Sequence, residues 1–180
     1  MRRVGEVQRV GYDGFMPFTV IVKNNVSLVS IGREVDIHAT EDLNLLGATI
    51  TTQRLKFDCG AISRISSSGI TAWIRGLPSL GNRVFSFVNC TEQILDAILM
   101  IPQFTGSGWV ESVSIQLSCD GCQHRDGRIF QALQGHMPKL AVPGICPKCA
   151  GHLDFGVDLT SNLESLDERG VFKPRTLSET

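Results

Sequence analysis

Four cysteines in two short pairs constrain this chain more than any other feature of its sequence. The pairs are Cys119 with Cys122 and Cys146 with Cys149, each with the spacing C-x-x-C. Two such knuckles suit a tetrahedral zinc ion, because each tight turn directs two sulfurs at one point. Four thiolates leave no coordination position for water or substrate, so we expect a structural zinc ion and no catalytic metal chemistry.

Two rival interpretations of the cysteines are weaker. A redox-active C-x-x-C pair usually accompanies a thioredoxin-like βαβ pattern, which does not flank these knuckles. A disulfide framework suits short secreted chains, whereas this chain of 180 residues is rich in core residues and lacks the apolar run of a signal peptide after residues 1–5. Cys59 and Cys90 lie in or beside apolar segments, and we expect both to be small buried hydrophobic residues.

Alternating apolar residues lead into the first knuckle and away from the second. They predict strands at 113–117 and 153–159, with residues 128–133 as a candidate third strand, which is the arrangement of a zinc ribbon. Gly121 and Gly151 are expected to supply the positive φ that tight turns require.

The composition restricts the partners of the chain. With 42% hydrophobic residues, 19% charged residues and a net charge of −1, the chain has enough core for one domain plus an appendage. No segment approaches the ~20 apolar residues that span a bilayer, so we expect a cytoplasmic protein without a membrane partner. The ribbon has four basic and three acidic side chains: Arg125, Arg128, Lys139 and Lys148 against Asp120, Asp126 and Asp154. With a zinc tetrathiolate its charge would be about −1, which argues against nucleic acid.

Residues 18–117 alternate strand-like and helix-like segments, which predicts an α/β layer fold. A hairpin is expected through Asn24-Asn25. The expected strands are 18–22, 26–31, 55–59 and 84–88, and the expected helices begin at Thr40, just after 66–69, at Asn89 and at Ser161. Thr40 is predicted to be an N-cap, and Asn89 with Glu92 is predicted to form a second cap. Residues 161–164 are predicted to form a capping box, which opens a helix that ends at Gly170.

The predicted organisation has five parts. They are an N-terminal extension at 1–17, an α/β domain at 18–117, a zinc ribbon at 118–156 inserted before the last helix, a closing strand and helix at 157–172, and a tail at 173–180.

Four segments of the α/β domain share a pattern with a known family. They are Ile-Gly-Arg-Glu-Val-Asp at 31–36, Leu-Lys-Phe-Asp at 55–58, Ile-Ser-Ser-Ser-Gly-Ile at 65–70 and Val-Phe-Ser-Phe-Val-Asn at 84–89. In this order they resemble the STAS family, the anti-sigma factor antagonist domains, and the third segment is similar to its Asp-Ser-Ser-Gly-Leu signature. The resemblance implies a STAS-like mixed sheet with packed helices, and regulation through protein contacts without catalysis.

The same resemblance implies a phosphorylation switch at Ser67. In the family's bacterial regulators a partner kinase phosphorylates the serine after the Asp, and the partner is then released. A phosphate at a helix N-terminus adds about −1.5 to −2 charge and would repel an acidic or apolar partner surface. Ser66 stands where the family has Asp, so the group that would orient the acceptor hydroxyl is absent. The alternative is that Ser66, Ser67, Ser68 and Gly69 form only a helix cap.

The leading hypothesis is therefore a bacterial, non-enzymatic interaction module with structural Zn²⁺, whose partner is a regulatory protein such as an anti-sigma factor or a serine kinase. The runner-up is a zinc-ribbon adaptor for nucleic acid or the transcription machinery, and a thiol redox sensor is a third hypothesis. The sequence does not determine the oligomeric state. His124, His136 and His152 lie near the knuckles, but four cysteines already satisfy zinc, so we expect these histidines to be exposed or to support the ligands.

Overall fold

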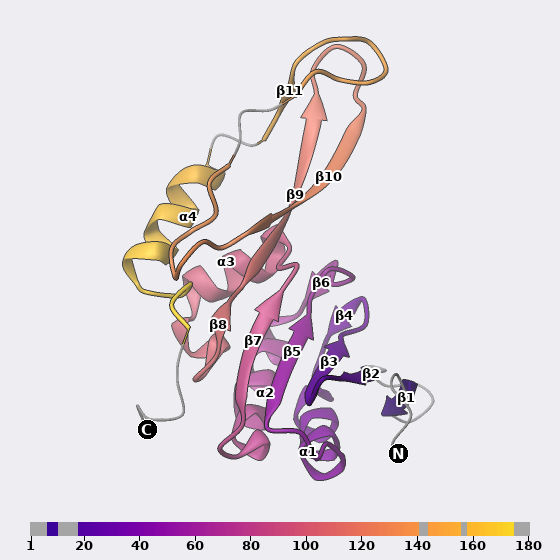
Figure 1. Cartoon of the computed structure of the whole chain (residues 1–180), viewed down its shortest axis with the longest axis vertical. Coiled ribbons are helices and arrows are strands. Elements are labelled where there is room, and N and C mark those ends of the chain that lie inside the picture. The colour runs from indigo at the N-terminus through magenta and orange to yellow at the C-terminus, as the bar shows by residue number, and fades with distance from the viewer. Residues whose placement is uncertain (1–6, 11–17, 141–143, 156–157, 175–180) are drawn as a thin grey trace.

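A mixed sheet, a layer of helices and a projecting hairpin make up the fold (Figure 1), which the computed structural model describes for residues 7–10, 18–140, 144–155 and 158–174. The six-stranded sheet has the order β1-β2-β3-β5-β7-β8. Its strands are β1 (Val7–Val10), β2 (Phe18–Lys23), β3 (Val26–Ser30), β5 (Arg54–Asp58), β7 (Val84–Val88) and β8 (Trp109–Val110). The first three pair antiparallel, and β3, β5, β7 and β8 pair parallel. The predicted α/β fold with a mixed sheet is confirmed.

The hairpin between β2 and β3 forms where the sequence predicts it. Asn24 and Asn25 have φ of 51° and 62°, the left-handed pair of a two-residue hairpin turn, and Lys23 pairs with Val26. The segment predicted to be an N-terminal extension contributes a strand of its own, because β1 pairs antiparallel with β2. Residues 1–6 and 11–17 of that segment lie outside the described residues.

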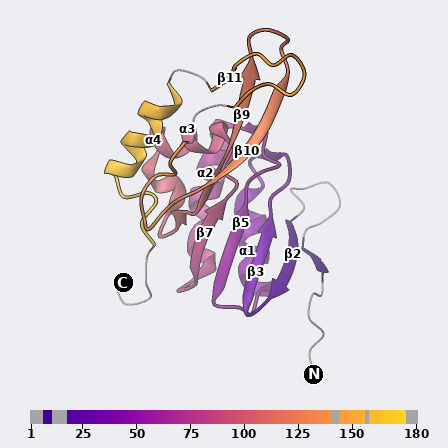
Figure 2. The same ribbon diagram turned by 45° about the horizontal axis from the view of Figure 1, so that its top comes forward.

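Four α-helices lie in the described part of the chain. They are α1 (Ala39–Thr49), α2 (Ser67–Gly76), α3 (Glu92–Met100) and α4 (Leu159–Glu168), with short 3-10 helices η1 (Leu77–Leu80) and η2 (Pro102–Thr105). In both Figure 1 and Figure 2, α1 and α2 lie behind the sheet. None of these helices in the described part of the chain is long and apolar enough to cross a membrane.

An aromatic cluster joins the sheet to α2. The Phe57 and Trp73 rings meet edge-on with centroids 5.4 Å apart, and the Trp73 and Phe104 rings stack at 5.6 Å. The Trp73 indole N–H donates to the Phe104 carbonyl oxygen at 3.0 Å, which satisfies the one polar group of this buried ring. Because Trp73 is fixed at both its ring face and its N–H, the orientation of α2 on the sheet is fixed as well.

Three predicted helix caps were wrong: the side chains of Thr40 and Asn89 form tertiary hydrogen bonds, and the helix of Ser161 begins before that residue. Thr40 lies inside α1, and its hydroxyl donates to the Ala72 carbonyl at 2.8 Å. Asn89 lies before α3 with φ of 54°, and its amide donates to Asp58 at 3.0 Å. Ser161 lies in the first turn of α4, which begins at Leu159, where a strand was expected.

Arg83 lies outside α1 and binds carbonyl groups at the C-terminal end of that helix. The last turn of α1 contains no basic residue, although cations favour that end of a helix. The Arg83 guanidinium donates to four carbonyl oxygens, those of Gly47 at 3.1 Å, Ile50 at 2.6 Å, Thr52 at 3.2 Å and Leu80 at 2.8 Å. One side chain therefore connects α1, η1 and the start of β5.

A long strand, β9 (Ser112–Cys119), carries the chain from the core to the first knuckle. Its alternate side chains are buried, from Val113 to Cys119. Its start is held in the core because Cys90 and β9 exchange backbone hydrogen bonds, from Cys90 N to Ser112 O at 2.9 Å and from Ser114 N to Cys90 O at 2.8 Å. The predicted boundary between residues 117 and 118 lies inside β9, so one strand runs through both predicted parts.

The ribbon sheet has the order β10-β9-β11, with β10 (Arg125–Gln131) and β11 (Leu153–Asp154) antiparallel to β9. β10 is the predicted candidate third strand, shifted toward the first knuckle. β11 is shorter than the predicted strand at 153–159, of which residues 156–157 lie outside the described residues. Figure 1 shows β9 and β10 projecting from the sheet, with α4 beside their base.

Candidate metal centre

The two cysteine pairs meet at the end of the projecting hairpin. The four sulfurs of Cys119, Cys122, Cys146 and Cys149 all lie within 4.8 Å of one another. Two of the separations join sulfurs of different knuckles, 3.4 Å between Cys119 and Cys149 and 3.6 Å between Cys122 and Cys146. These separations exceed the ~2.05 Å of a disulfide bond, so the sulfurs are free thiols that could hold a metal ion.

The two knuckles have the same backbone design. In each, the N–H of the residue after the second cysteine donates to the carbonyl of the first, and the N–H of the first cysteine donates to a carbonyl five residues on. The bonds are Gln123 N to Cys119 O at 2.9 Å, Cys119 N to His124 O at 2.9 Å, Ala150 N to Cys146 O at 3.0 Å and Cys146 N to Gly151 O at 2.8 Å. Two matching turns of this kind direct four sulfurs at one point.

The glycines of the knuckles do not have the predicted role. Among the described residues the positive φ values at the knuckles belong to Gln123 and Ala150, both 57°, and the prediction for Gly121 and Gly151 was wrong. Gly151 is needed for space, because a Cβ there would lie 3.2 Å from the Cys149 sulfur and 3.3 Å from the Cys119 sulfur. This close approach lets the Gly151 N–H donate to the Cys149 sulfur at 3.4 Å.

Strand pairing brings the second knuckle to the first. Cys119 is the last residue of β9 and lies opposite Leu153 of β11. The Leu153 N–H donates to the Gly144 carbonyl at 3.1 Å, and Ile145 forms a β-bridge with His152. The residues on both sides of the second knuckle are thus paired with each other, and through β11 with β9.

Burial and hydrogen bonding make the four thiols unequal. Cys119 and Cys146 are buried, whereas Cys122 and Cys149 are exposed. Burial raises the pKa of the Cys146 thiol, but the backbone N–H groups of Lys148 and Cys149 outweigh burial and lower that pKa to about 7. The Gly151 N–H lowers the pKa of Cys149, but the neighbouring Cys119 and Cys122 sulfurs outweigh it and raise that pKa to about 12. In the metal-free cluster the Cys149 thiol therefore keeps its proton at neutral pH, and it must lose that proton to bind a metal ion.

The histidines near the knuckles do not join the cluster. Within the described residues, the one group of cysteine, histidine or acidic side chains close enough to hold a metal is the four cysteines. His152 is exposed and its Nδ1 lies 3.3 Å from the Leu153 carbonyl oxygen. His136 is exposed and lies 3.4 Å from an Asp167 carboxylate oxygen, which ties the segment after β10 to α4.

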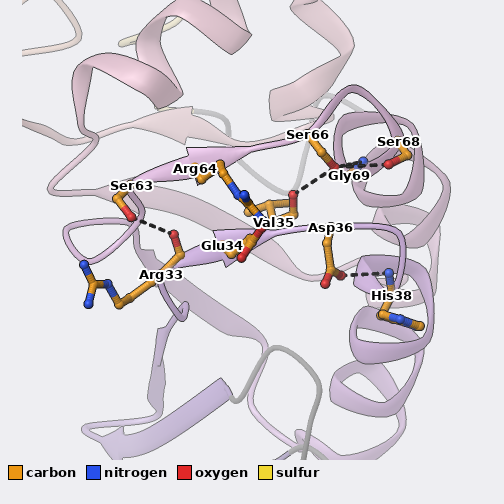
Figure 3. Close-up of polar contacts among 10 residues, drawn as sticks. All are labelled: Arg33, Glu34, Val35, Asp36, His38, Ser63, Arg64, Ser66, Ser68 and Gly69. Atoms are coloured by element: carbon orange, nitrogen blue, oxygen red, sulfur yellow. Dashed lines mark hydrogen bonds and ion pairs between the residues drawn. The ribbon is translucent and has the colours of Figure 1, made fainter.

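The serine motif lies on a different element, at the start of α2. Ser66 is the N-cap, and its hydroxyl oxygen accepts the Gly69 N–H at 2.9 Å and lies 3.1 Å from the Ser68 hydroxyl (Figure 3). Ser67 is the first residue of the helix and is exposed. The predicted helix is confirmed, but it starts at Ser67, whereas the sequence predicted a start just after residue 69.

Gly69 permits a close approach that the sequence reasoning missed. A Cβ at Gly69 would lie 2.1 Å from the carbonyl oxygen of Val35, the last residue of β4 (Glu34–Val35). The Ser66 N–H donates to the same carbonyl at 3.1 Å, next to the parallel pair of β4 and β6 (Arg64–Ile65). Figure 3 shows this loop against the start of α2, with the Asp36 carboxylate accepting the His38 N–H at 2.9 Å. The position of the glycine in the sequence did not indicate that Gly69 packs against the Val35 carbonyl.

The sequence matches no protein-family model and no curated protein. The likeness to STAS domains therefore rests on the four segments of sequence that carry it.

Proposed function

We propose that this chain is a non-catalytic regulatory module of the anti-sigma factor antagonist type, which binds a protein partner through the start of α2. The observation that carries the proposal is the position of Ser67. It is exposed, it is the first residue of α2, and the hydroxyl of its neighbour Ser66 already serves as the cap. The Ser67 hydroxyl is therefore available for a partner or for modification.

The docking surface consists of Ser67, Ser68 and Ile37. Ile37 follows the Val35 backbone that packs against Gly69, so the loop of Ile37 lies beside the start of α2. The Ile37 side chain is 58% exposed, so its apolar surface can contact a partner. An apolar side chain beside two hydroxyls gives a partner an anchor and two polar contacts.

Phosphorylation of Ser67 would act on this surface through charge. A phosphate adds about −1.5 to −2 charge at a helix N-terminus, where the dipole and the free N–H groups stabilise it. The same charge opposes an acidic partner and raises the desolvation cost of an apolar one. Ser66 in place of the family's Asp leaves the acceptor hydroxyl without a carboxylate that would orient it, so a kinase would have to supply that group.

The metal that we propose for the four cysteines is one structural Zn²⁺. A tetrahedral ion with Zn–S bonds of ~2.3 Å separates its sulfurs by about 3.8 Å. The cross-knuckle separations of 3.4 Å and 3.6 Å are close to that value. The ion would clamp the end of β9 to the residues that flank β11, and with four thiolates it would have no position for a substrate.

We place the protein in the bacterial cytoplasm, with an anti-sigma factor or a serine kinase as its partner. The test is affinity capture with mass spectrometry of the captured proteins and of Ser67. Ser67→Glu should weaken capture of the partner, and Ser67→Ala should preserve it. Ser107→Glu adds the same charge at another exposed serine and serves as the matched control. Equal capture by all three variants, with no phosphate at Ser67, would contradict the switch and leave the serine as a helix residue.

A further inference from the structure

The four-cysteine centre has an asymmetry that a purely structural metal site does not require. One cysteine of each knuckle is exposed and one is buried: Cys122 and Cys149 are exposed, and Cys119 and Cys146 are buried. Each exposed sulfur has a buried sulfur of the other knuckle close by, at 3.6 Å from Cys122 to Cys146 and 3.4 Å from Cys149 to Cys119. These two pairs share no cysteine, so both can react in the same molecule.

From this arrangement we propose that the centre is an oxidation site for hydroperoxides, at which the metal is exchanged for two disulfides that link the knuckles to each other. The disulfides are Cys119–Cys149 and Cys122–Cys146. The inference rests on the metal binding proposed above. Exposed cysteines beside a second thiol are the arrangement in which a sulfenic acid is captured as a disulfide.

The chemistry balances with hydrogen peroxide as the oxidant. The exposed Cys122 thiolate attacks one peroxide oxygen, the O–O bond breaks, a sulfenic acid forms and hydroxide leaves. The buried Cys146 thiolate then attacks the Cys122 sulfur, so that the S–S bond forms, the S–O bond breaks and a second hydroxide leaves. Cys149 and Cys119 react in the same way with a second peroxide. Four thiolates give up four electrons in total, two peroxides accept them, and the Zn²⁺ leaves in its original oxidation state.

The geometry allows both links between the knuckles to form. Each cross-knuckle pair has to close by only about 1.5 Å to reach a disulfide bond length. Two such links would hold the same backbone segments that the metal holds, namely the end of β9 and the turn before β11. The ribbon would then persist after the metal leaves. A disulfide within each C-x-x-C would join two residues of the same turn and would leave the two knuckles without a covalent link to each other.

Three other sulfur-containing residues provide internal controls. Cys59 and Cys90 are fully buried in the core and are expected to stay reduced. Met100 is 70% exposed and is expected to become a sulfoxide, which reports that the oxidant has acted on the protein.

The experiment starts from protein whose zinc content has been measured by elemental analysis. Excess hydrogen peroxide is added, zinc release is followed with a chromogenic chelator, and remaining thiols are alkylated. Asp-N cleavage before Asp120 and tryptic cleavage after Lys148 place each of the four cysteines on its own peptide, so mass spectrometry identifies every link. We expect complete zinc release, the two cross-knuckle disulfides, and a melting temperature above that of reduced, zinc-free protein.

Two results would overturn the proposal. One is zinc retention under conditions that oxidise Met100. The other is release accompanied by Cys119–Cys122 and Cys146–Cys149 links or by sulfinic acids. Protein that carries no zinc at the start would instead count against the proposed metal, so the two failures are distinguishable.

Discussion

Replacing Gly69 by alanine should destabilise the protein, although alanine is the better helix former by about 0.5–1 kcal/mol. The added Cβ would lie 2.1 Å from the Val35 carbonyl oxygen, 2.6 Å from its carbon and 2.9 Å from Asp36 N. The start of α2 would have to move by about 1 Å to reach ordinary contact distances, and such overpacking costs about 1–3 kcal/mol. The movement also weakens the cap from Ser66, worth about 1 kcal/mol. The expected net loss is about 1–3.5 kcal/mol.

Urea unfolding monitored by circular dichroism measures this loss, with the slope checked for a change in cooperativity. Arg75→Ala is the control, because Arg75 is an exposed residue of the same helix and lies away from the cap. We expect the control to lie within about 0.5 kcal/mol of the wild type. Wild-type stability or better in Gly69→Ala would refute the reasoning, since helix propensity would then outweigh the contact with Val35.

Three further predictions test other parts of the account. Arg83→Ala should lower the free energy of unfolding by about 2–3 kcal/mol, because four carbonyl groups lose a charged donor, while Arg54→Ala at an exposed position should change it little in the same urea assay. Zinc affinity should fall as pH decreases, because the Cys149 thiol has a pKa of about 12 in the metal-free cluster and must lose its proton to bind zinc. A chelator competition that finds no pH dependence of the zinc affinity would contradict this prediction. Fluorescence anisotropy should detect only weak binding of DNA or RNA at physiological salt, because the ribbon lacks a basic stripe; tight, salt-sensitive binding would favour the adaptor hypothesis.

Local sequence predicted those elements whose stability is local. The Asn24-Asn25 turn needs only two residues that tolerate positive φ, and the strand at 84–88 is apolar at every position except Ser86, so both appear where expected. The cysteine cluster was predictable because C-x-x-C spacing fixes the geometry of each turn. The start of α2 also follows from short-range chemistry, since Ser66 caps a helix whose apolar face is regular.

Features that depend on contacts between distant residues could not be predicted from the local sequence. The Thr40 hydroxyl is bonded to Ala72, 32 residues away, and its capping propensity is therefore not used at the helix N-terminus. β1 is a short strand that exists through pairing with β2, and its four residues give little periodicity. The contact between Gly69 and Val35 joins a helix to a two-residue strand, and nothing in the spacing of the sequence reports it.

A single measurement decides whether the four cysteines bind the proposed metal ion. Native mass spectrometry of protein purified under reducing conditions, compared with the mass after acid denaturation, counts the metal ions bound to each chain and identifies them by mass. We expect one zinc ion per chain and its loss in Cys119→Ser, which removes one of the four converging sulfurs. A native mass equal to that of the bare polypeptide, with all four cysteines present as thiols or as disulfides, would contradict this expectation.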